Sequence, residues 1–241
     1  MKSKYRNNRE DQNPEPERHA VWEKTFNFSP VPYSSNNRSR KKNFCQQIQD
    51  VISDSNFIYV DLLLDMRIEL YTNLKELHRI HKVPDLDNSL KLICDSLKGA
   101  KGLVIDDCQF QHISISTIDT CLSPHFRIEI RSISDEYMMK PVSLFEMPDG
   151  LYYPLSITTL DSEEKRNIFL TSIYRLVRSS GDVFKNLINS GLEQTVAFHS
   201  SSYLFPILKG FPRSRISKSG FELVRFKDWF DNPDIKEMVA K

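Results

Sequence analysis

Long apolar runs are absent from this sequence. No stretch approaches the roughly 18 consecutive apolar residues of a membrane-spanning helix, and the polar N-terminal stretch lacks the apolar core of a secretory signal. We therefore expect a cytoplasmic protein without a membrane partner. Cysteine is also scarce: the four cysteines are widely spaced and form no CxxC pair. This pattern indicates neither a disulfide framework nor a cysteine zinc site, and it predicts reduced thiols in or near the core.

The composition is that of a folded protein. Of the 241 residues, 39% are hydrophobic and 27% are charged, which excludes a disordered or collagen-like chain. The length suits one large domain or two small ones. The net charge of +1 hides a mildly basic N-terminal part and an acidic centre between residues 57 and 141. Such a distribution is compatible with one segment that contacts phosphate and another that holds cations.

The N-terminal third alternates polar and apolar segments. Residues 1–24 are polar and rich in proline, so we expect a disordered tail. A short strand is expected over 26–32, where it ends at prolines. Helical spacing of apolar residues predicts a helix over 40–54, and the β-branched and aromatic run 57–71 predicts a long buried strand.

The middle of the chain predicts a helix followed by two strands. The helix begins at Asp87 or Asn88 as its N-cap and ends at the glycines near residue 100. Its apolar stripe consists of Leu90, Ile93, Cys94 and Leu97. Strands are expected over 103–118 and 126–133 as an antiparallel pair. Together these elements predict an α+β domain over residues 25–140, with a mixed β-sheet and packed helices.

The C-terminal part, residues 141–241, has a different character. It starts with a proline-punctuated linker, and two helices follow over 162–179 and 181–191. The first has a capping-box spacing between Asp161 and Glu164, and the second ends at a glycine. We expect a smaller, mainly helical accessory region, and its last fifty or so residues carry no assignable pattern.

Acidic residues gather around the central helix. Asp87, Lys91 and Asp95 are spaced i, i+4, i+8, so they lie along one helix face. Asp85 immediately precedes that helix. Alone, an aspartate at such a place is also typical of a helix cap.

A second acidic pair, Asp106 and Asp107, follows the helix. If the strand that starts near Leu103 packs beside the helix, one of the two returns to the neighbourhood of Asp87. Three converging carboxylates cannot all stay ionised without a cation, and Mg²⁺ prefers such oxygen ligands. Side chains alternate along a strand, and Asp107 shares the parity of the core-facing isoleucines, which favours it over Asp106. The alternative interpretation is a turn at the start of the strand.

These residues resemble the RusA family of Holliday junction resolvases. PDLDNSLKLICDSLKG (84–99) followed by VIDDCQF (104–110) is similar to that family's DxDNxxK motif, further helix aspartate and DD strand start. SSNNR (34–38), placed after FSPVP, is similar to its N-terminal signature. The resemblance covers about residues 26–133.

The resemblance implies a homodimeric, Mg²⁺-dependent endonuclease, with Mn²⁺ as a substitute, that nicks four-way DNA junctions in recombination and repair. By position, Asp85, Asp87 and Asp107 would bind the metal, and Lys91 would be the catalytic or phosphate-positioning lysine. Asn88, Asp95 and Asp106 would support them. A lysine one turn after Asp87 can reach a phosphate oxygen at the same cation.

Basic residues suggest where branched DNA binds. Junctions are recognised mainly through phosphates, and the candidates are Arg38, Arg40, Lys41 and Lys42. Their alternative interpretation is a solvated helix start. Residues 141–241 lie beyond the resemblance and could bind DNA or a protein partner. Two alternative functions therefore stay open, a nuclease for other branched or flap DNA and a non-catalytic DNA-binding regulator.

Overall fold

The computed structural model describes most of the chain. The described residues are 21–30, 38–60, 62–74, 86–132, 136–156, 160, 162–202 and 209–240. The N-terminal elements are β1 (Val21–Phe26), α1 (Arg38–Ile52), β2 (Phe57–Tyr59), β3 (Leu64–Thr72), α3 (Leu86–Leu97), the 3₁₀ helix η1 (Asp107–Gln109), β4 (Phe110–Asp119), β5 (His125–Ser132) and β6 (Tyr137–Met139). The C-terminal elements are β7 (Ser143–Glu146), β8 (Tyr152–Leu155), α4 (Glu163–Asn189), α5 (Gln194–Ser202), α6 (Arg213–Ile216), β9 (Leu223–Val224), α7 (Phe226–Phe230) and α8 (Pro233–Ala240). No described helix is both long and apolar enough to cross a membrane.

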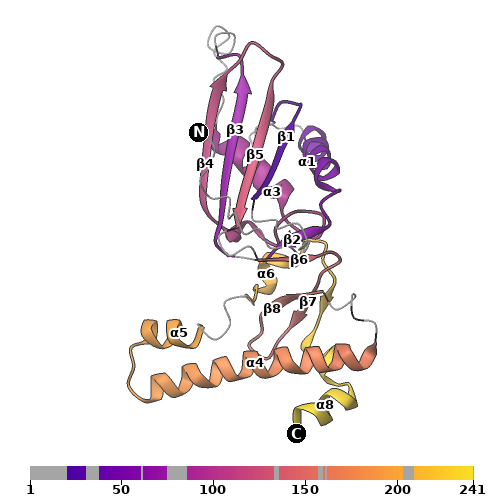
Figure 1. The fold of residues 1–241 in the computed structure, drawn as a ribbon, viewed down its shortest axis with the longest axis vertical. Helices are drawn as coiled ribbons and strands as arrows, with labels where there is room; N and C mark the ends of the chain where they lie inside the picture. The colour runs from indigo at the N-terminus through magenta and orange to yellow at the C-terminus, as the bar shows by residue number, and fades with distance from the viewer. Residues whose placement is uncertain are drawn as a thin grey trace, which may run out of the picture.

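The main sheet has the strand order β1-β5-β3-β4 (Figure 1). β3 pairs antiparallel with β5 and parallel with β4, so Ile68 lies between Ile128 and Ile115. The predicted pairing of β4 with β5 is therefore wrong, because β3 separates them. β3 and β5 each bury more than half of their residues, whereas β4 exposes every second residue or so. β3 and β5 take the two inner positions of the sheet, where both edges of each strand are paired, and β1 and β4 lie at its edges.

Two predicted strands have different bounds in the structure. The single strand expected over 57–71 is split into β2 and β3, because β2 pairs with β6 instead of joining the main sheet. The strand expected over 26–32 lies earlier in the chain. It is β1, which ends at Phe26 and shares only that residue with the predicted range. Residues 21–24, assigned to the tail from the sequence, belong to β1 and pair with β5. Charged residues are common on an edge strand such as β1, so their presence did not indicate a tail. Residues 1–20 lie outside the described part.

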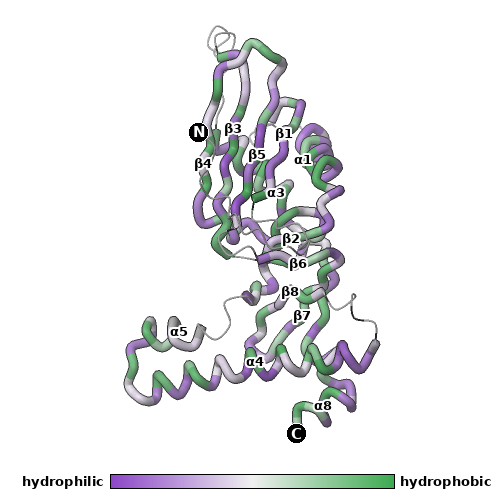
Figure 2. Tube along the Cα trace, in the orientation of Figure 1, coloured by the Kyte–Doolittle hydropathy of each residue, from purple (hydrophilic) through white to green (hydrophobic). Residues whose placement is uncertain are grey.

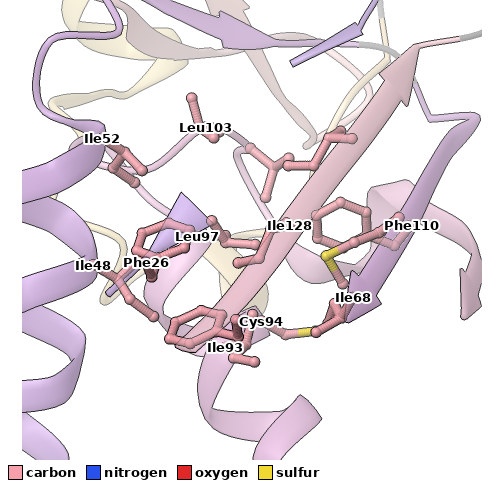
Figure 3. Packing of buried hydrophobic residues seen from close by; sticks show 14 of the residues in the cluster. Phe26, Ile48, Ile52, Ile68, Ile93, Cys94, Leu97, Leu103, Phe110 and Ile128 are labelled. Carbon is pink, nitrogen blue, oxygen red and sulfur yellow. The ribbon is translucent and has the colours of Figure 1, made fainter. Parts of the chain in front are cut away.

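The main core lies between this sheet and helices α1 and α3, which cover one of its faces. Figure 3 shows Ile48 and Ile52 from α1 and Ile93 and Leu97 from α3 pointing into the same space. The stripe predicted for α3 is thus confirmed, with Leu90 half-buried and its other members buried. At one end of the core the rings of Phe26 and Phe126 stack with centroids 4.7 Å apart.

The C-terminal region combines helices with a three-stranded sheet of order β8-β7-β9. The long helix α4 lies across the end of the molecule, beyond β7 and β8 (Figure 1). Figure 2 shows hydrophilic and hydrophobic stretches alternating along α4. Its apolar residues, including Leu170, Ile173 and Tyr174, pack against β7, β8, α7 and α8 in a second core.

α4 replaces the two helices expected over 162–179 and 181–191. It runs for 27 residues through Gly181 and ends next to Gly191, whose φ is +88°. Its N-cap is Ser162, whose hydroxyl accepts a hydrogen bond from the Lys165 amide, and not Asp161 as the capping-box spacing suggested. An isolated glycine destabilises a helix by only about 1 kcal/mol relative to alanine. Tertiary packing of the flanking turns offsets this, so the helix continues past Gly181.

A third apolar cluster joins the two parts of the chain. Ile58, Val60 and Ile105 of the N-terminal part pack with Phe211 and Ile216 of the C-terminal part, together with Val142, Leu144 and Tyr152. All of these side chains are buried. The α+β class is confirmed, and the two parts share a hydrophobic core. A boundary near residue 140 stays our proposal for the end of the N-terminal domain, because β6 is the last strand that pairs there.

Two glycines allow a matched test of the close approach between residues 99 and 219. Gly99 has a φ of +93°, and a Cβ there would lie 2.5 Å from the Ser219 carbonyl oxygen. Gly99→Ala should therefore lower the free energy of unfolding by about 1–3 kcal/mol. Gly181→Ala should raise it by about 0.5–1 kcal/mol, because Gly181 is helical and a Cβ there meets no atom within 4 Å. Urea denaturation of both variants measures the difference, and equal stabilities would contradict the close approach of residues 99 and 219.

Candidate active site

The polar face of α3 carries charges of alternating sign. The Lys98 ammonium lies 2.7 Å from Asp95 Oδ1, and the Lys91 ammonium lies 3.8 Å from the same oxygen. These contacts place the three side chains along one face of α3. Asp87 is exposed in the first turn of the helix, about 12 Å from Asp95 along the axis. Asp85 lies outside the described residues.

A tight capped turn holds the second acidic pair. Asp106 is the N-cap of η1, and its carboxylate accepts a hydrogen bond from the Cys108 amide at 3.1 Å. The buried side chain of Gln109 accepts from the amides of Ile105 and Asp106 and donates to the Tyr59 carbonyl at 2.9 Å. This is a reciprocal capping box, and its D-x-x-Q spacing is readable in the sequence.

This turn corrects the argument from strand parity. A regular strand does not begin at Leu103, since β4 starts only at Phe110. Alternation along a strand therefore cannot decide between Asp106 and Asp107. Their burial does separate them: Asp106 is 4% exposed, whereas the side chain of Asp107 is 29% exposed. Asp107 is the member of the pair that solvent and a ligand can reach.

Asp107 faces the C-terminal half of α3. Its Oδ2 lies 3.3 Å from the Lys98 ammonium, which also contacts Asp95. Burial raises the pKa of the Cys94 thiol to about 12, and the charges of Asp107 and Asp95 contribute to the same shift. The structure thus brings Asp95, Lys98 and Asp107 together. Lys98 was missed by the sequence analysis, although its i, i+3 spacing from Asp95 indicates the contact.

Arg215 approaches the same pair from the C-terminal region. Its Nη1 lies 2.8 Å from Asp106 Oδ1 and 3.6 Å from Asp107 Oδ1. Burial by itself would raise the pKa of Asp106, but hydrogen bonds from Cys108 and from Arg215 outweigh it and lower the pKa. Asp106 is therefore ionised at neutral pH, and Arg215 balances its charge. Arg215 is 109 residues away in the chain, so no local pattern could have assigned it to the site.

A pocket of about 500 Å³ opens beside these residues. It lies between α1, the C-terminal end of α3 and the segment that includes α6. Its lining consists of Gln49, Asp95, Lys98, Ile105, Ser214, Arg215, Ser217, Lys218 and Ser219. We call it the Arg215 pocket.

The predicted DNA-binding residues occupy a different place. Arg38, Arg40, Lys41 and Lys42 form the start of α1, and all except the half-buried Lys41 are exposed. No acidic side chain lies in that first turn, so their charges add to the positive end of the helix dipole. Residue 38 is about 16 Å along the axis from Gln49, where α1 borders the Arg215 pocket. Residues 34–37 of the predicted signature lie outside the described part.

The described acidic residues have the right chemistry for a hard cation, but they do not form a complete binding site. Asp87, Asp95, Asp106 and Asp107 are oxygen donors of the kind that Mg²⁺ prefers. In the described part of the chain, however, no three acidic, histidine or cysteine side chains form a group that could hold a metal ion. Lys98 and Arg215 neutralise Asp107 there instead. The ligand set that includes Asp85 stays a prediction.

The mixed sheet with two helices on one face defines an α+β domain with acidic residues on α3 and on the turn before β4. Residues 29–131 match the family model described as Endodeoxyribonuclease RusA, so this segment is RusA-like and the predicted resemblance is confirmed. None of the curated proteins compared with the chain matches it. The matched segment contains the predicted acidic residues and Lys91. It ends before the C-terminal region, which contributes Arg215.

Proposed function

We propose that the protein is a Mg²⁺-dependent, structure-selective endonuclease that resolves four-way DNA junctions by paired nicks. The observation that carries this proposal is the match of residues 29–131 to an endodeoxyribonuclease family. The DxDNxxK and DD motifs both fall within that segment. Phosphate contacts would supply most of the affinity for branched DNA, because a junction is recognised by its shape.

The proposed metal ligands are Asp85, Asp87 and Asp107, with Mn²⁺ as a substitute for Mg²⁺. The bound metal would polarise the phosphodiester and lower the pKa of the attacking water. Asp107 supports this role by its accessibility, since its side chain is 29% exposed. Lys91, exposed on the same face of α3 as Asp95, would position a phosphate oxygen.

Other residues would orient this machinery. Asp106 and Gln109 hold the turn that presents Asp107 towards α3, so we assign Asp106 a positioning role. Asp95 and Lys98 would adjust the electrostatic environment of Asp107. Asn88 would stabilise the N-terminal end of α3. The pKa of Cys94 and that of Cys108 are both raised to about 12, mainly by burial. Both thiols therefore stay protonated at neutral pH and are poor nucleophiles or ligands.

We further propose a homodimer, because paired nicks on opposite strands of a junction need two active sites. The first four basic residues of α1 (Arg38, Arg40, Lys41 and Lys42) would contact the DNA arms. The C-terminal region supports one alternative, a nuclease for flap or other branched DNA, because Arg215 lies at the acidic pair and outside the matched family segment. A region with such a contact could change the choice of substrate.

The test compares a labelled four-way junction, a flap and a linear duplex, each with Mg²⁺ and with EDTA. We expect Mg²⁺-dependent, symmetrically paired nicks in the junction and none in the duplex. Faster cutting of the flap would favour the alternative nuclease. Junction binding without cutting in the presence of Mg²⁺ would favour a DNA-binding regulator over an enzyme. The absence of both binding and cutting would refute the proposal.

A further inference from the structure

The Arg215 pocket lies directly beside the acidic pair. Arg215 lines it and contacts both carboxylates, and Lys98 lines it and contacts Asp107. A group bound in this pocket would therefore lie next to the proposed nuclease centre. The residues of the pocket that follow position 131 are outside the matched family segment.

The charges and polar groups of the pocket suit a phosphodiester. Three of its lining residues are cations, namely Lys98, Arg215 and Lys218, and its one carboxylate, Asp95, is paired with Lys98 at 2.7 Å. The lining residues themselves carry more positive than negative charge, although Asp106 and Asp107, which contact Arg215 and Lys98, balance the total. Ser214 and Ser217 add hydroxyl groups that can donate hydrogen bonds to phosphate oxygens. A volume of about 500 Å³ also falls within the usual range of ligand pockets.

The geometry of Arg215 leaves donors available for a ligand. Within the described part of the chain, its recorded contacts with the acidic pair use only Nη1. A guanidinium has five N–H donors in a planar fork that matches two phosphate oxygens. Its side chain is 49% exposed, so the remaining donors can be reached. Arg215 can hold the acidic pair with one edge and a phosphate with the other.

The segment that carries these cations is attached to the N-terminal domain by a buried side chain and a backbone hydrogen bond. Ile216 is 1% exposed in the cluster that joins the two parts, and the Ser219 carbonyl accepts a hydrogen bond from the Ala100 amide at 2.9 Å. On the other side, Phe211 exchanges two backbone hydrogen bonds with Tyr152, at 2.8 and 2.9 Å. Arg215 and Lys218 thus need little reorganisation on binding, which lowers the entropic cost of a contact.

We propose that the Arg215 pocket binds a backbone phosphate of the branched DNA, so that the C-terminal region completes the nuclease site. This inference rests on the proposed function. Arg215 would have two roles, to neutralise the acidic pair that would otherwise repel the DNA and to position the strand beside Asp107. Lys218 would contribute a second, exposed positive charge to the same phosphate or its neighbour.

The test measures binding of a labelled four-way junction by fluorescence anisotropy, in EDTA, over a series of salt concentrations. Each lost phosphate contact lowers the slope of log K against log salt by about 0.9. Lys218→Ala should show one such loss, and Lys218→Ala combined with Arg215→Ala should show about two. Lys227→Ala on α7 is the matched control, because Lys227 is exposed, carries the same charge and does not line the pocket. Its slope should equal that of the wild type.

Thermal denaturation will show whether loss of Arg215 unfolds the chain. If it does, the salt dependence of Lys218→Ala alone tests the inference. Lys218 is exposed, so its removal should not disturb folding. Wild-type slopes for Lys218→Ala and for every folded Arg215 variant would overturn this inference and leave the proposed function intact. An equal decrease for Lys227→Ala would also overturn it, since the effect would then reflect net charge. Failure of the wild type to bind the junction would overturn both proposals.

Discussion

Asp107→Asn is expected to abolish Mg²⁺-dependent nicking of the four-way junction while leaving the chain folded. Loss of one proposed metal ligand should remove several kcal/mol of transition-state stabilisation, and each 1.4 kcal/mol or so corresponds to tenfold in rate. We therefore expect a decrease of at least about a hundredfold in single-turnover cleavage. Junction binding should be unchanged or tighter, because the neutral amide repels the phosphates less.

Two variants serve as controls for this result. Asp182→Asn makes the same chemical change at an exposed position on α4 and should cleave like the wild type. Asp106→Ala removes the buried N-cap of η1, so it should lower the free energy of unfolding by about 0.5–2 kcal/mol, which Asp107→Asn should not do. Wild-type cleavage by Asp107→Asn would show that the metal ligands are wrongly assigned.

Removal of residues 141–241 is expected to leave an unfolded or insoluble fragment. The cut would expose Ile58, Val60 and Ile105, which are at most 1% exposed in the complete chain. Burial of such side chains contributes about 1.5–3 kcal/mol each. Their sum is comparable with the roughly 5–15 kcal/mol that stabilises a whole domain. Circular dichroism and sedimentation of residues 21–140 would measure the outcome.

A pair of point variants tests the shared cluster without removing any chain. Phe211→Ala should lower the free energy of unfolding by about 3–5 kcal/mol, because the ring is 2% exposed at the junction of the two parts. Leu122→Ala should change it by less than about 0.5 kcal/mol, since that side chain is 67% exposed. A soluble, cooperatively folded fragment together with a stable Phe211→Ala would instead support an independent N-terminal domain.

The helices of the N-terminal domain were predictable because their signals are local. The stripe that includes Ile93 and Leu97 lies within four turns of one helix, and α1 was placed within two residues of its observed bounds. The pairing of the strands was not predictable in this way. Both β4 and β5 were correctly predicted as strands, but their pairing depends on which segment from elsewhere in the chain packs between them, and that segment is β3.

The same distinction applies to the candidate site. The sequence alone determined the motif residues from Asp85 to Asp107 and their RusA-like spacing, because those residues lie close together in the chain. Only the tertiary structure showed that Asp106 is buried and Asp107 accessible, and it brought Arg215 to them across 109 residues. The physical reason is that capping and helical spacing act between near neighbours in the chain. Burial and charge neutralisation depend instead on which distant segment packs against the site, and here the shared cluster around Phe211 and Ile216 makes that choice.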